Sequence, residues 1–190
     1  PNFIWPGGNI YYAIHNNIKH RIGEIKAAIK IWQDLLYGII QFHEVDSSPP
    51  RNYIVFSLSN GYGSFVGMQG GRQDLFIQSI PEIGNIVHEI GHSIGLWHEH
   101  SRLDRDEFIK INTENIMSYA LKEFEEVIGS GSSIEGIGYD YSSIMHYGRF
   151  AFSKNNEPTI EPTKNPSAII GQRNQPSPYD ILGIKRMYNK

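Results

Sequence analysis

Residues 88–100, HEIGHSIGLWHEH, concentrate histidine and glutamate side chains that could bind and use a metal ion. His88 and His92 are four residues apart, so on a helix their imidazoles project from one face, about one turn from each other. His98 follows six residues later, and on a continuous helix it would face away from that side. Gly95 removes this difficulty, because glycine accepts the backbone conformation that ends a helix and turns the chain back. Three neutral imidazoles with an open fourth position are typical of a catalytic zinc site.

Glu89 is the acid most closely tied to this cluster. It follows His88 directly and points about 100° away from it on a helix, so it is poorly placed as a ligand. It is well placed to take a proton from a metal-bound water, whose pKa falls from about 15.7 toward about 7. A lone histidine is more often an ordinary helix or loop residue, but this combination at fixed spacings favours a metal site. His100 is left over, and we expect a solvent-exposed or supporting role for it, because Gly95 already accounts for His98.

The histidine pair requires a helix, and the surrounding sequence predicts one. Over residues 83–94, IGNIVHEIGHSI, most of the other side chains are apolar, as in a helix that packs into a core. Upstream, HRIGEIKAAIKIWQDLL has apolar side chains at steps of three and four and predicts an amphipathic helix over 20–36. Strands are indicated by short apolar runs with turn residues between them, at 9–15, 39–45, 53–59 and within the glycine-rich stretch 61–78.

The second half of the chain is less regular. A short helical candidate covers residues 112–127. Near the end, Ser177 can cap a helix, Pro178 suits its first position, and Asp180 places an acid at the third. These residues predict a final helix over 178–188.

Length and composition limit the class of protein. A chain of 190 residues with 39% hydrophobic composition suits one α+β domain, spanning residues 1–190, with a real core. The net charge of -3 and the lack of a basic cluster argue against nucleic acid as a partner. No apolar run approaches the roughly 20 residues that a membrane span needs, so we expect no membrane association. The sequence has no cysteine, which excludes disulfides and leaves histidine and carboxylate as the plausible metal ligands.

The metal-binding stretch also carries a family signature. The pattern H-E-x-x-H-x-x-G-x-x-H resembles the metzincin class of zinc peptidases, and SSIMHYG at 142–148 resembles the methionine-containing turn of that class, with Met145 as its methionine. Glu99, directly after the third histidine, is the choice of the astacin family. The chain is similar to that family from Trp5 to Tyr188. The other matching stretches are SFVGMQGG (64–71), HEHSRLDRD (98–106), INTENI (111–116), YDYSSIMHY (139–147) and IGQR (170–173).

The resemblance implies roles for individual residues. It implies one Zn²⁺ ion per chain held by His88, His92 and His98, with Glu89 as general base and proton shuttle. It also implies that Tyr147 is an additional zinc ligand that swings to the oxyanion during catalysis; from the residues alone, Tyr147 would be a core aromatic. Three further residues have supporting roles by the same resemblance: Met145 as an apolar floor beneath the zinc, Gly95 at the turn and Glu99 beside the site.

The resemblance implies a fold as well. It is the metzincin, zincin-like catalytic domain: a mixed, twisted sheet with the active-site helix in an N-terminal half, and a mostly irregular C-terminal half that ends in a helix. We place the N-terminal subdomain at about 1–95 and the C-terminal subdomain at about 96–190, with the active-site cleft between them. The astacin family also implies an extended substrate that adds an antiparallel strand along 64–69. Its contacts would be Ser64, Phe65, Val66 and Gly67; from the sequence alone, a buried interior strand is an equal alternative.

One feature departs from the animal members of the family. Those members carry two disulfides, whereas this chain has Tyr62, Gly63 and Ser64 where they have Cys-Trp-Ser. We therefore expect a bacterial-type, cysteine-free member. The resemblance also implies that a pro-segment inhibits the enzyme before activation and that the released amino terminus approaches Glu99; whether Pro1 does so is left open by the sequence.

Together these features predict a secreted zinc endopeptidase that acts on protein or peptide substrates. Attack on the peptide bond would come from a zinc-bound water activated by Glu89. Two alternatives belong to other classes of protein. One is a catalytically silent zinc-binding or peptide-binding module, although Glu89 and all three ligands are intact. The other is a structural zinc site, which would need His100 as a fourth protein ligand.

Overall fold

The computed structural model describes residues 4–45, 49–127 and 136–188, and Pro1 lies outside them. The chain divides into two compact units, one formed by Pro1–Leu96 with Arg173–Lys190 and the other by Trp97–Gln172. The first boundary is one residue from the predicted one. The second differs, because the sequence predicts that the whole of 96–190 belongs to the C-terminal subdomain. The reason is a long-range contact: the Tyr188 hydroxyl donates to the Ile94 carbonyl (3.0 Å) and accepts from the Trp5 N–H (3.3 Å).

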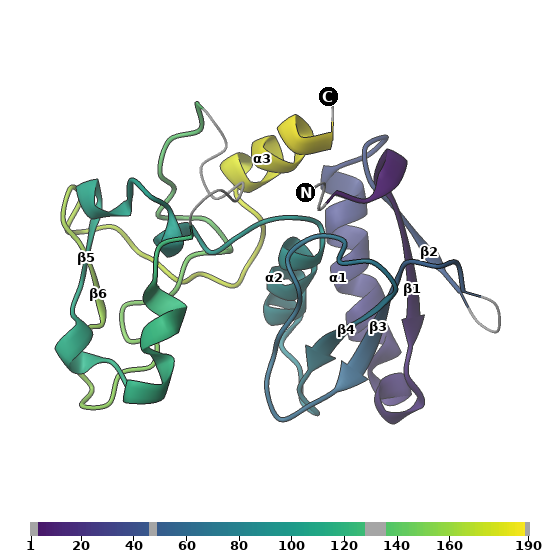
Figure 1. Ribbon diagram of the computed structural model, residues 1–190, viewed down its shortest axis with the longest axis horizontal. Helices are drawn as coiled ribbons and strands as arrows, with labels where there is room; N and C mark the ends of the chain where they lie inside the picture. The colour runs from purple at the N-terminus through teal and green to yellow at the C-terminus, as the bar shows by residue number, and fades with distance from the viewer. Residues whose placement is uncertain (1–3, 46–48, 128–135, 189–190) are drawn as a thin grey trace. The chain divides into compact units, whose positions relative to one another are not determined.

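The first unit contains a four-stranded sheet in the order β2-β1-β3-β4 (Figure 1). Each pair of neighbouring strands is parallel. The register pairs Tyr12 with Glu44 on one side and with Ile54 on the other. The strands are β1 (Asn9–Ile14), β2 (Gln41–Glu44), β3 (Tyr53–Leu58) and β4 (Arg72–Ile77).

Two helices pack together beside this sheet, α1 (Ile22–Leu35) and α2 (Ile83–Ser93). The apolar face predicted for α1 is buried, with Ile25 and Trp32 fully excluded from solvent. The Trp32 indole N–H donates to the Val87 carbonyl of α2 (2.9 Å), which fixes one helix against the other. The predicted helices over 20–36 and 83–94 are therefore confirmed, except that α1 begins two residues later, after a 3-10 turn.

The glycine-rich stretch 61–78 differs from the prediction. Only β4 forms there, preceded by one antiparallel bridge between Gly63 and Phe76. Among the described residues this bridge is the antiparallel part of the sheet, so the expected mixed sheet is nearly all parallel. The chain turns away after the bridge because Gly67, Gly70 and Gly71 adopt positive φ angles of 67°, 91° and 75°.

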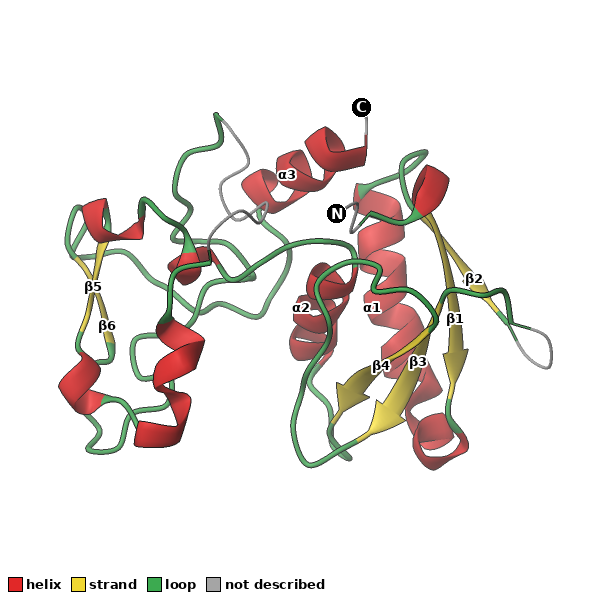
Figure 2. Cartoon of the chain, in the orientation of Figure 1, coloured by secondary structure: helices red, strands yellow, loops and turns green. Residues whose placement is uncertain are grey.

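The second unit consists largely of loops and short helices (Figure 2). Its two strands, β5 (Ile109–Ile111) and β6 (Ile160–Pro162), pair antiparallel. The predicted helix over 112–127 is replaced by two short 3-10 helices, because backbone groups there bond outside the segment. The Met117 N–H donates to the Phe152 carbonyl (2.9 Å), and the Asn115 carbonyl accepts from the Lys154 N–H (2.9 Å). The described 3-10 helices of both units are Pro6–Gly8, Asn16–Arg21, Glu99–Ser101, Arg105–Glu107, Thr113–Asn115 and Ser118–Phe124.

The predicted final helix is confirmed as α3 (Pro178–Tyr188). Its start has the predicted reciprocal cap: the Asp180 N–H donates to the Ser177 hydroxyl (3.0 Å), and the Ser177 N–H donates to the Asp180 carboxylate (2.8 Å). Across the part of the chain that the structure describes, no helix has the length and apolar character needed to cross a membrane. Taken together, the helices, the parallel sheet and the small antiparallel sheet confirm the α+β class.

Candidate metal and catalytic site

Helix α2 carries the first two histidines and ends at Ser93, just before the turn at Gly95. His88 and His92 are both buried, at 5% and 6% exposure. Gly95 then adopts φ 123°, and its N–H donates to the His92 carbonyl (2.8 Å). The Leu96 N–H donates to the Gly91 carbonyl (2.9 Å), which completes a Schellman ending of the helix. The turn predicted at Gly95 is confirmed.

His98 comes three residues after this turn. The ligand atoms of His88, His92 and His98 all lie within 4.8 Å of one another. Two ligands about 2.1 Å from one zinc ion in a tetrahedral arrangement are about 3.4 Å apart, so the three nitrogen atoms lie near the spacing that zinc requires. A donor set of three imidazoles suits zinc and leaves one coordination position for another ligand.

The surroundings of His92 prepare it as a ligand. Its Nδ1–H donates to the Leu96 carbonyl (2.8 Å), so Nε2 is the nitrogen left for a metal. Burial lowers the pKa of His92 to about 4. The imidazole is therefore neutral at physiological pH, which is the form that binds a metal.

Glu89 is buried beside this pair, at 6% exposure. Burial raises its pKa to about 8, and the nearby Arg173 acts in the opposite direction. Its Oε2 atom has no hydrogen-bond partner among the described residues. An unpaired buried carboxyl oxygen costs about 1–3 kcal/mol, so this atom is a buried acceptor that the described residues leave unsatisfied.

The second unit contributes the methionine turn. Met145 is buried at 1% exposure, and its carbonyl accepts from the Glu99 N–H (3.2 Å). The Glu99 carboxylate accepts from the Asp140 N–H (2.7 Å) and from the Arg102 guanidinium (3.2 Å). Glu99, directly after His98, is thus hydrogen-bonded both to Met145 of the methionine turn and to Asp140, just before that turn.

Tyr147 is half-buried and lies against two histidine rings. Its ring centroid is 4.4 Å from that of His98 and 4.1 Å from that of His100, which is stacked on it. His100 is fully buried, and its Nε2–H donates to the Glu123 carbonyl (2.9 Å). The expectation of a solvent-exposed His100 is therefore wrong, and the supporting role remains. With Nε2 used in this way, His100 is also a poor candidate for a fourth zinc ligand.

The predicted substrate segment 64–69 is not an interior strand. Phe65 is 55% exposed, and Ser64 and Val66 are half-buried. Gly67 differs from them, because it is buried and both of its backbone groups bond within the protein. Its N–H donates to the His92 carbonyl (2.8 Å), and its carbonyl accepts from the Gln73 side chain (3.0 Å). The alternative of a buried strand is wrong, and Gly67 belongs to the support of the segment.

A family model described as "Astacin", a family of peptidases, matches residues 1–189. The chain belongs to the astacin family. Members of this family use one zinc ion, and the three histidines of this chain form a donor set that fits it.

Relatives of known sequence and structure agree with this assignment. Zinc metalloproteinase nas-36 of Caenorhabditis elegans is 37% identical over 190 residues, covering 98% of this chain and 30% of the relative. Low choriolytic enzyme of Oryzias latipes is 39% identical over 148 residues, covering 77% of this chain and 54% of the relative. The chain therefore spans less than two thirds of the length of these curated relatives. The bacterial-type origin suggested by the lack of cysteine stays a prediction.

A solved astacin-family structure matches the fold. High choriolytic enzyme 1, a hatching enzyme zinc-protease from Oryzias latipes, superposes with a TM-score of 0.85 at 34% identity. The match covers 95% of this chain and 89% of that chain. The metzincin fold predicted from the signature is confirmed.

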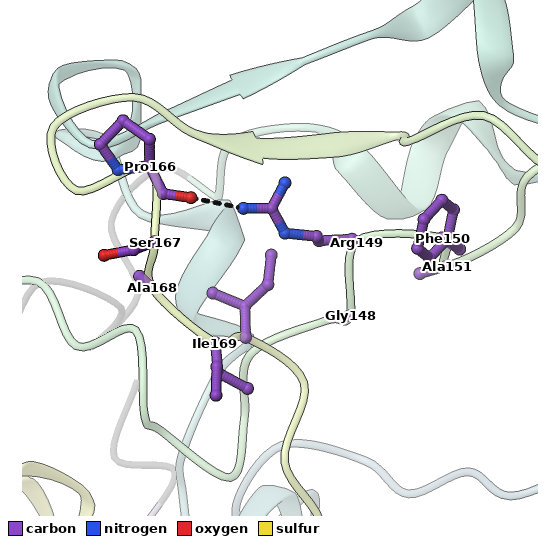
Figure 3. A pocket seen from close by; sticks show the side chains of 9 residues that line it. Gly148, Arg149, Phe150, Ala151, Pro166, Ser167, Ala168 and Ile169 are labelled. Atoms are coloured by element: carbon purple, nitrogen blue, oxygen red, sulfur yellow. Dashed lines mark hydrogen bonds between the residues drawn. The ribbon is translucent and has the colours of Figure 1, made fainter.

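Two features of this astacin domain have no role in the sequence prediction. Arg173 acts electrostatically on both Glu89 and His92, and its carbonyl lies 1.6 Å from the place where a Cβ on Gly84 would stand. Only glycine at position 84 lets the Arg173 backbone approach α2 so closely. The second feature is a cavity of about 640 Å³ in the second unit (Figure 3). Gly148, directly after Tyr147, is one of the residues that line it. IGQR matches the family and marks Arg173, but nothing in the sequence shows its contact with α2.

Figure 3 shows one hydrogen bond between two residues that line this cavity. The Arg149 guanidinium reaches across to donate to the Pro166 carbonyl (2.7 Å). Ile169, which also lines the cavity, is 84% exposed. Most of the residues that line the cavity are apolar or glycine, and the cation among them, Arg149, is held by the protein's own backbone.

Proposed function

We propose that this chain is a zinc-dependent endopeptidase that hydrolyses peptide bonds in proteins. The observation that carries the proposal is the group of His88, His92 and His98, whose ligand atoms lie within 4.8 Å of one another. Beside it in the sequence stands the buried carboxylate of Glu89, with an oxygen atom that bonds no described residue. A structural zinc site has no need of such a carboxylate, whereas a hydrolase needs a base.

The three histidines hold the metal in this proposal. Zinc, when bound there, lowers the pKa of a water molecule toward about 7 and polarises the carbonyl that is to be attacked. Glu89 accepts the proton of the attacking water and later donates it to the leaving amine. Burial supports this shuttle, because it raises the pKa of Glu89 above that of an ordinary carboxyl group, and an acid–base catalyst works best with a pKa near the working pH.

Tyr147 acts on the carbonyl oxygen. We assign it as an additional zinc ligand in the resting enzyme and as a hydrogen-bond donor to the oxyanion during the reaction. A phenol has a pKa of about 10 and so keeps the proton that it must donate. Its contact with the ring of His98, at 4.4 Å between centroids, supports this assignment, and stacking on His100 limits where the ring can go. Met145, buried at 1% exposure, is the apolar floor of this proposed arrangement.

The substrates are proteins or peptides bound in extended form, with Ser64, Phe65 and Val66 as the backbone edge that receives them. The exposure of Phe65 (55%) supports an accessible edge there. We further propose that the enzyme is secreted and that its own pro-segment inhibits it before activation, in line with its family membership. High choriolytic enzyme 1 is described as a hatching enzyme zinc-protease, and we extend the protease class to this chain.

Hydrolysis of fluorescein-labelled casein tests the proposal. The purified protein should cleave casein, should stop when a chelator removes the metal, and should recover when Zn²⁺ is restored. The Glu89→Gln variant should bind one equivalent of zinc and cleave almost nothing. Stoichiometric zinc with no cleavage of casein or gelatin by the unaltered protein would overturn the proposal in favour of a silent binding module.

A further inference from the structure

Gln73 is a buried amide whose hydrogen bonds all support the proposed substrate edge. It lies in β4 with 3% of its surface exposed. Its side-chain oxygen accepts from the Gln69 N–H (3.0 Å), and its side-chain NH₂ donates to the Gly67 carbonyl (3.0 Å). One side chain from the sheet therefore fixes two backbone groups of the neighbouring connection.

Gly67 is held a second time, from the other direction. Its N–H donates to the carbonyl of His92, one of the three histidines of the metal site (2.8 Å). Its φ of 67° lies in the left-handed region that glycine adopts without strain. The connection is thus anchored to β4 through Gln73 and to α2 through His92, and Gly67 is the point where the two anchors meet.

The anchors leave a short stretch of backbone for a partner. At its other end, Gly63 exchanges two hydrogen bonds with Phe76 (3.3 and 2.8 Å). Between them, the backbone N–H groups of Ser64, Phe65 and Val66 bond to nothing in the parts of the chain that the structure describes. A stretch of three residues, if extended, would span about 10 Å, which is enough for two or so hydrogen bonds of an antiparallel ladder.

We propose that Gln73 is a positioning residue for substrate: it clamps Gly67 and Gln69 so that Ser64–Val66 is held in place and receives the substrate main chain in a fixed register with the metal site. The inference rests on the proposed peptidase function. It goes further in two ways. The ladder is limited to three residues, and the side chain that supports these residues, that of Gln73, does not touch substrate. The physical reason is preorganisation, because an edge that is already anchored at both ends loses little conformational entropy when a peptide binds.

Three variants separate this role from a general contribution to stability. Gln73→Met keeps the length of the side chain and removes both hydrogen bonds. Gln73→Glu keeps the acceptor for Gln69 and loses the donor to Gly67. Gln78→Met is the matched control, because Gln78 also donates from its side chain to a backbone carbonyl of this connection, that of Asn60 (3.2 Å), but at the far end from the clamp.

The measurement compares ordinary and N-methylated peptides. An octapeptide spanning a bond of casein that the unaltered enzyme cuts is labelled with fluorescein, and each main-chain amide is methylated in turn. Dissociation constants are then measured by anisotropy in the Glu89→Gln background, where the peptide is not consumed. N-methylation removes one substrate donor and places a methyl group between the two main chains, which also keeps the edge N–H groups from the substrate carbonyls, so at ladder positions it should weaken binding about five- to tenfold, and at other positions it should have little effect.

In the Gln73 variants, the difference in affinity between peptides methylated at ladder positions and at other positions should shrink. Gln73→Met should bind the unmethylated peptide about five- to tenfold more weakly, and methylation should then cost less than about twofold, because the two changes remove the same contacts. Gln73→Glu should fall between, and Gln78→Met should match the parent. If methylation costs as much in Gln73→Met as in the parent, Gln73 stabilises the fold without positioning substrate, and the inference is wrong.

Zinc content and melting temperature verify that each variant folds. If Gln73→Met does not fold, Gln73→Glu is used for the comparison. If the unaltered protein does not cut casein, there is no cleaved bond from which to choose the octapeptide. That outcome refutes the proposed function and is distinct from a failure of the role proposed for Gln73.

Discussion

The left-handed turn at Gly95 offers the sharpest test of how the chain builds its metal site. We predict that Gly95→Ala lowers both the stability of the protein and its affinity for zinc. Gly95 has φ 123°, a conformation that a residue with a Cβ atom rarely adopts. A Cβ there would meet only the end of Met187 at 3.4 Å, which is ordinary contact, so the cost comes from the backbone.

The size of the effect follows from that strain. A non-glycine residue held in a sparsely populated region costs about 1–3 kcal/mol. In a domain of this size, each kcal/mol lowers the melting temperature by about 2–4 °C, so a loss of about 2–12 °C is expected. If alanine relaxes the turn in the metal-free protein, His98 moves away from His88 and His92. Zinc binding must then restore the strained turn, so the part of the strain that relaxation removes from the melting temperature appears instead as weaker affinity, by about 5- to 150-fold if all of it is relaxed, at about 1.4 kcal/mol per factor of ten.

Gly38→Ala is the matched control. Gly38 also has a positive φ (77°) and open space around its Cβ position, but it follows α1 and has no part in the histidine group. It should lose stability to a similar degree and bind zinc as the unaltered protein does. The assay is thermal unfolding in the presence of a chelator, together with competition for zinc against a chromophoric chelator. If Gly95→Ala behaves like Gly38→Ala in both measurements, the turn at Gly95 does not position His98 and the reasoning fails.

The other predictions concern the proposed chemistry. Glu89→Gln should retain zinc by metal analysis and lose nearly all casein hydrolysis, because an amide cannot accept the proton of the attacking water; near-normal turnover would remove Glu89 from the mechanism. Tyr147→Phe should retain zinc and lower kcat by about 10²- to 10³-fold with a much smaller change in KM, as for loss of one oxyanion donor, whereas a raised KM with kcat intact would make Tyr147 a substrate-binding residue. His98→Ala should lose zinc and His100→Ala should keep it, and the reverse result would overturn the ligand assignment.

The metal site could be predicted because its parts are local in sequence. The spacing of His88 and His92 fixes their common face on a helix, and Gly95 supplies the one backbone conformation that brings His98 back. The helices were predictable for similar reasons: the periodic apolar face of α1 and the cap formed by Ser177 and Asp180 act within a few residues of each other.

The rest of the support depends on contacts between distant residues, which periodicity does not report. The chain after Gly63 has the composition of a strand, yet it leaves the sheet because Gly67 bonds to the His92 carbonyl, 25 residues further on. Gln73 bonds to residues only four and six positions before it, Gln69 and Gly67, but nothing in the periodicity distinguishes it from any other polar residue on a strand. Likewise, the buried cluster that includes Phe124 and Tyr139 gathers residues from β5, β6, the 3-10 helix Ser118–Phe124 and the adjoining connections, so no local pattern indicates it.

The return of the last segment to the first unit sets an order of assembly during synthesis. The Tyr188 hydroxyl bonds both to the Trp5 backbone near the start of the chain and to the Ile94 carbonyl at the end of α2. Burial raises the pKa of Tyr188 to about 12, so it keeps the proton that it donates. A ribosome must therefore translate Trp97–Gln172 before the first unit can close. A premature stop codon in place of the codon for Arg173 would leave the nascent protein without the segment that approaches Gly84, Ile94 and Gly95. Such a truncated chain would contain every proposed ligand and catalytic residue, yet its metal-bearing helix would remain uncovered at both ends.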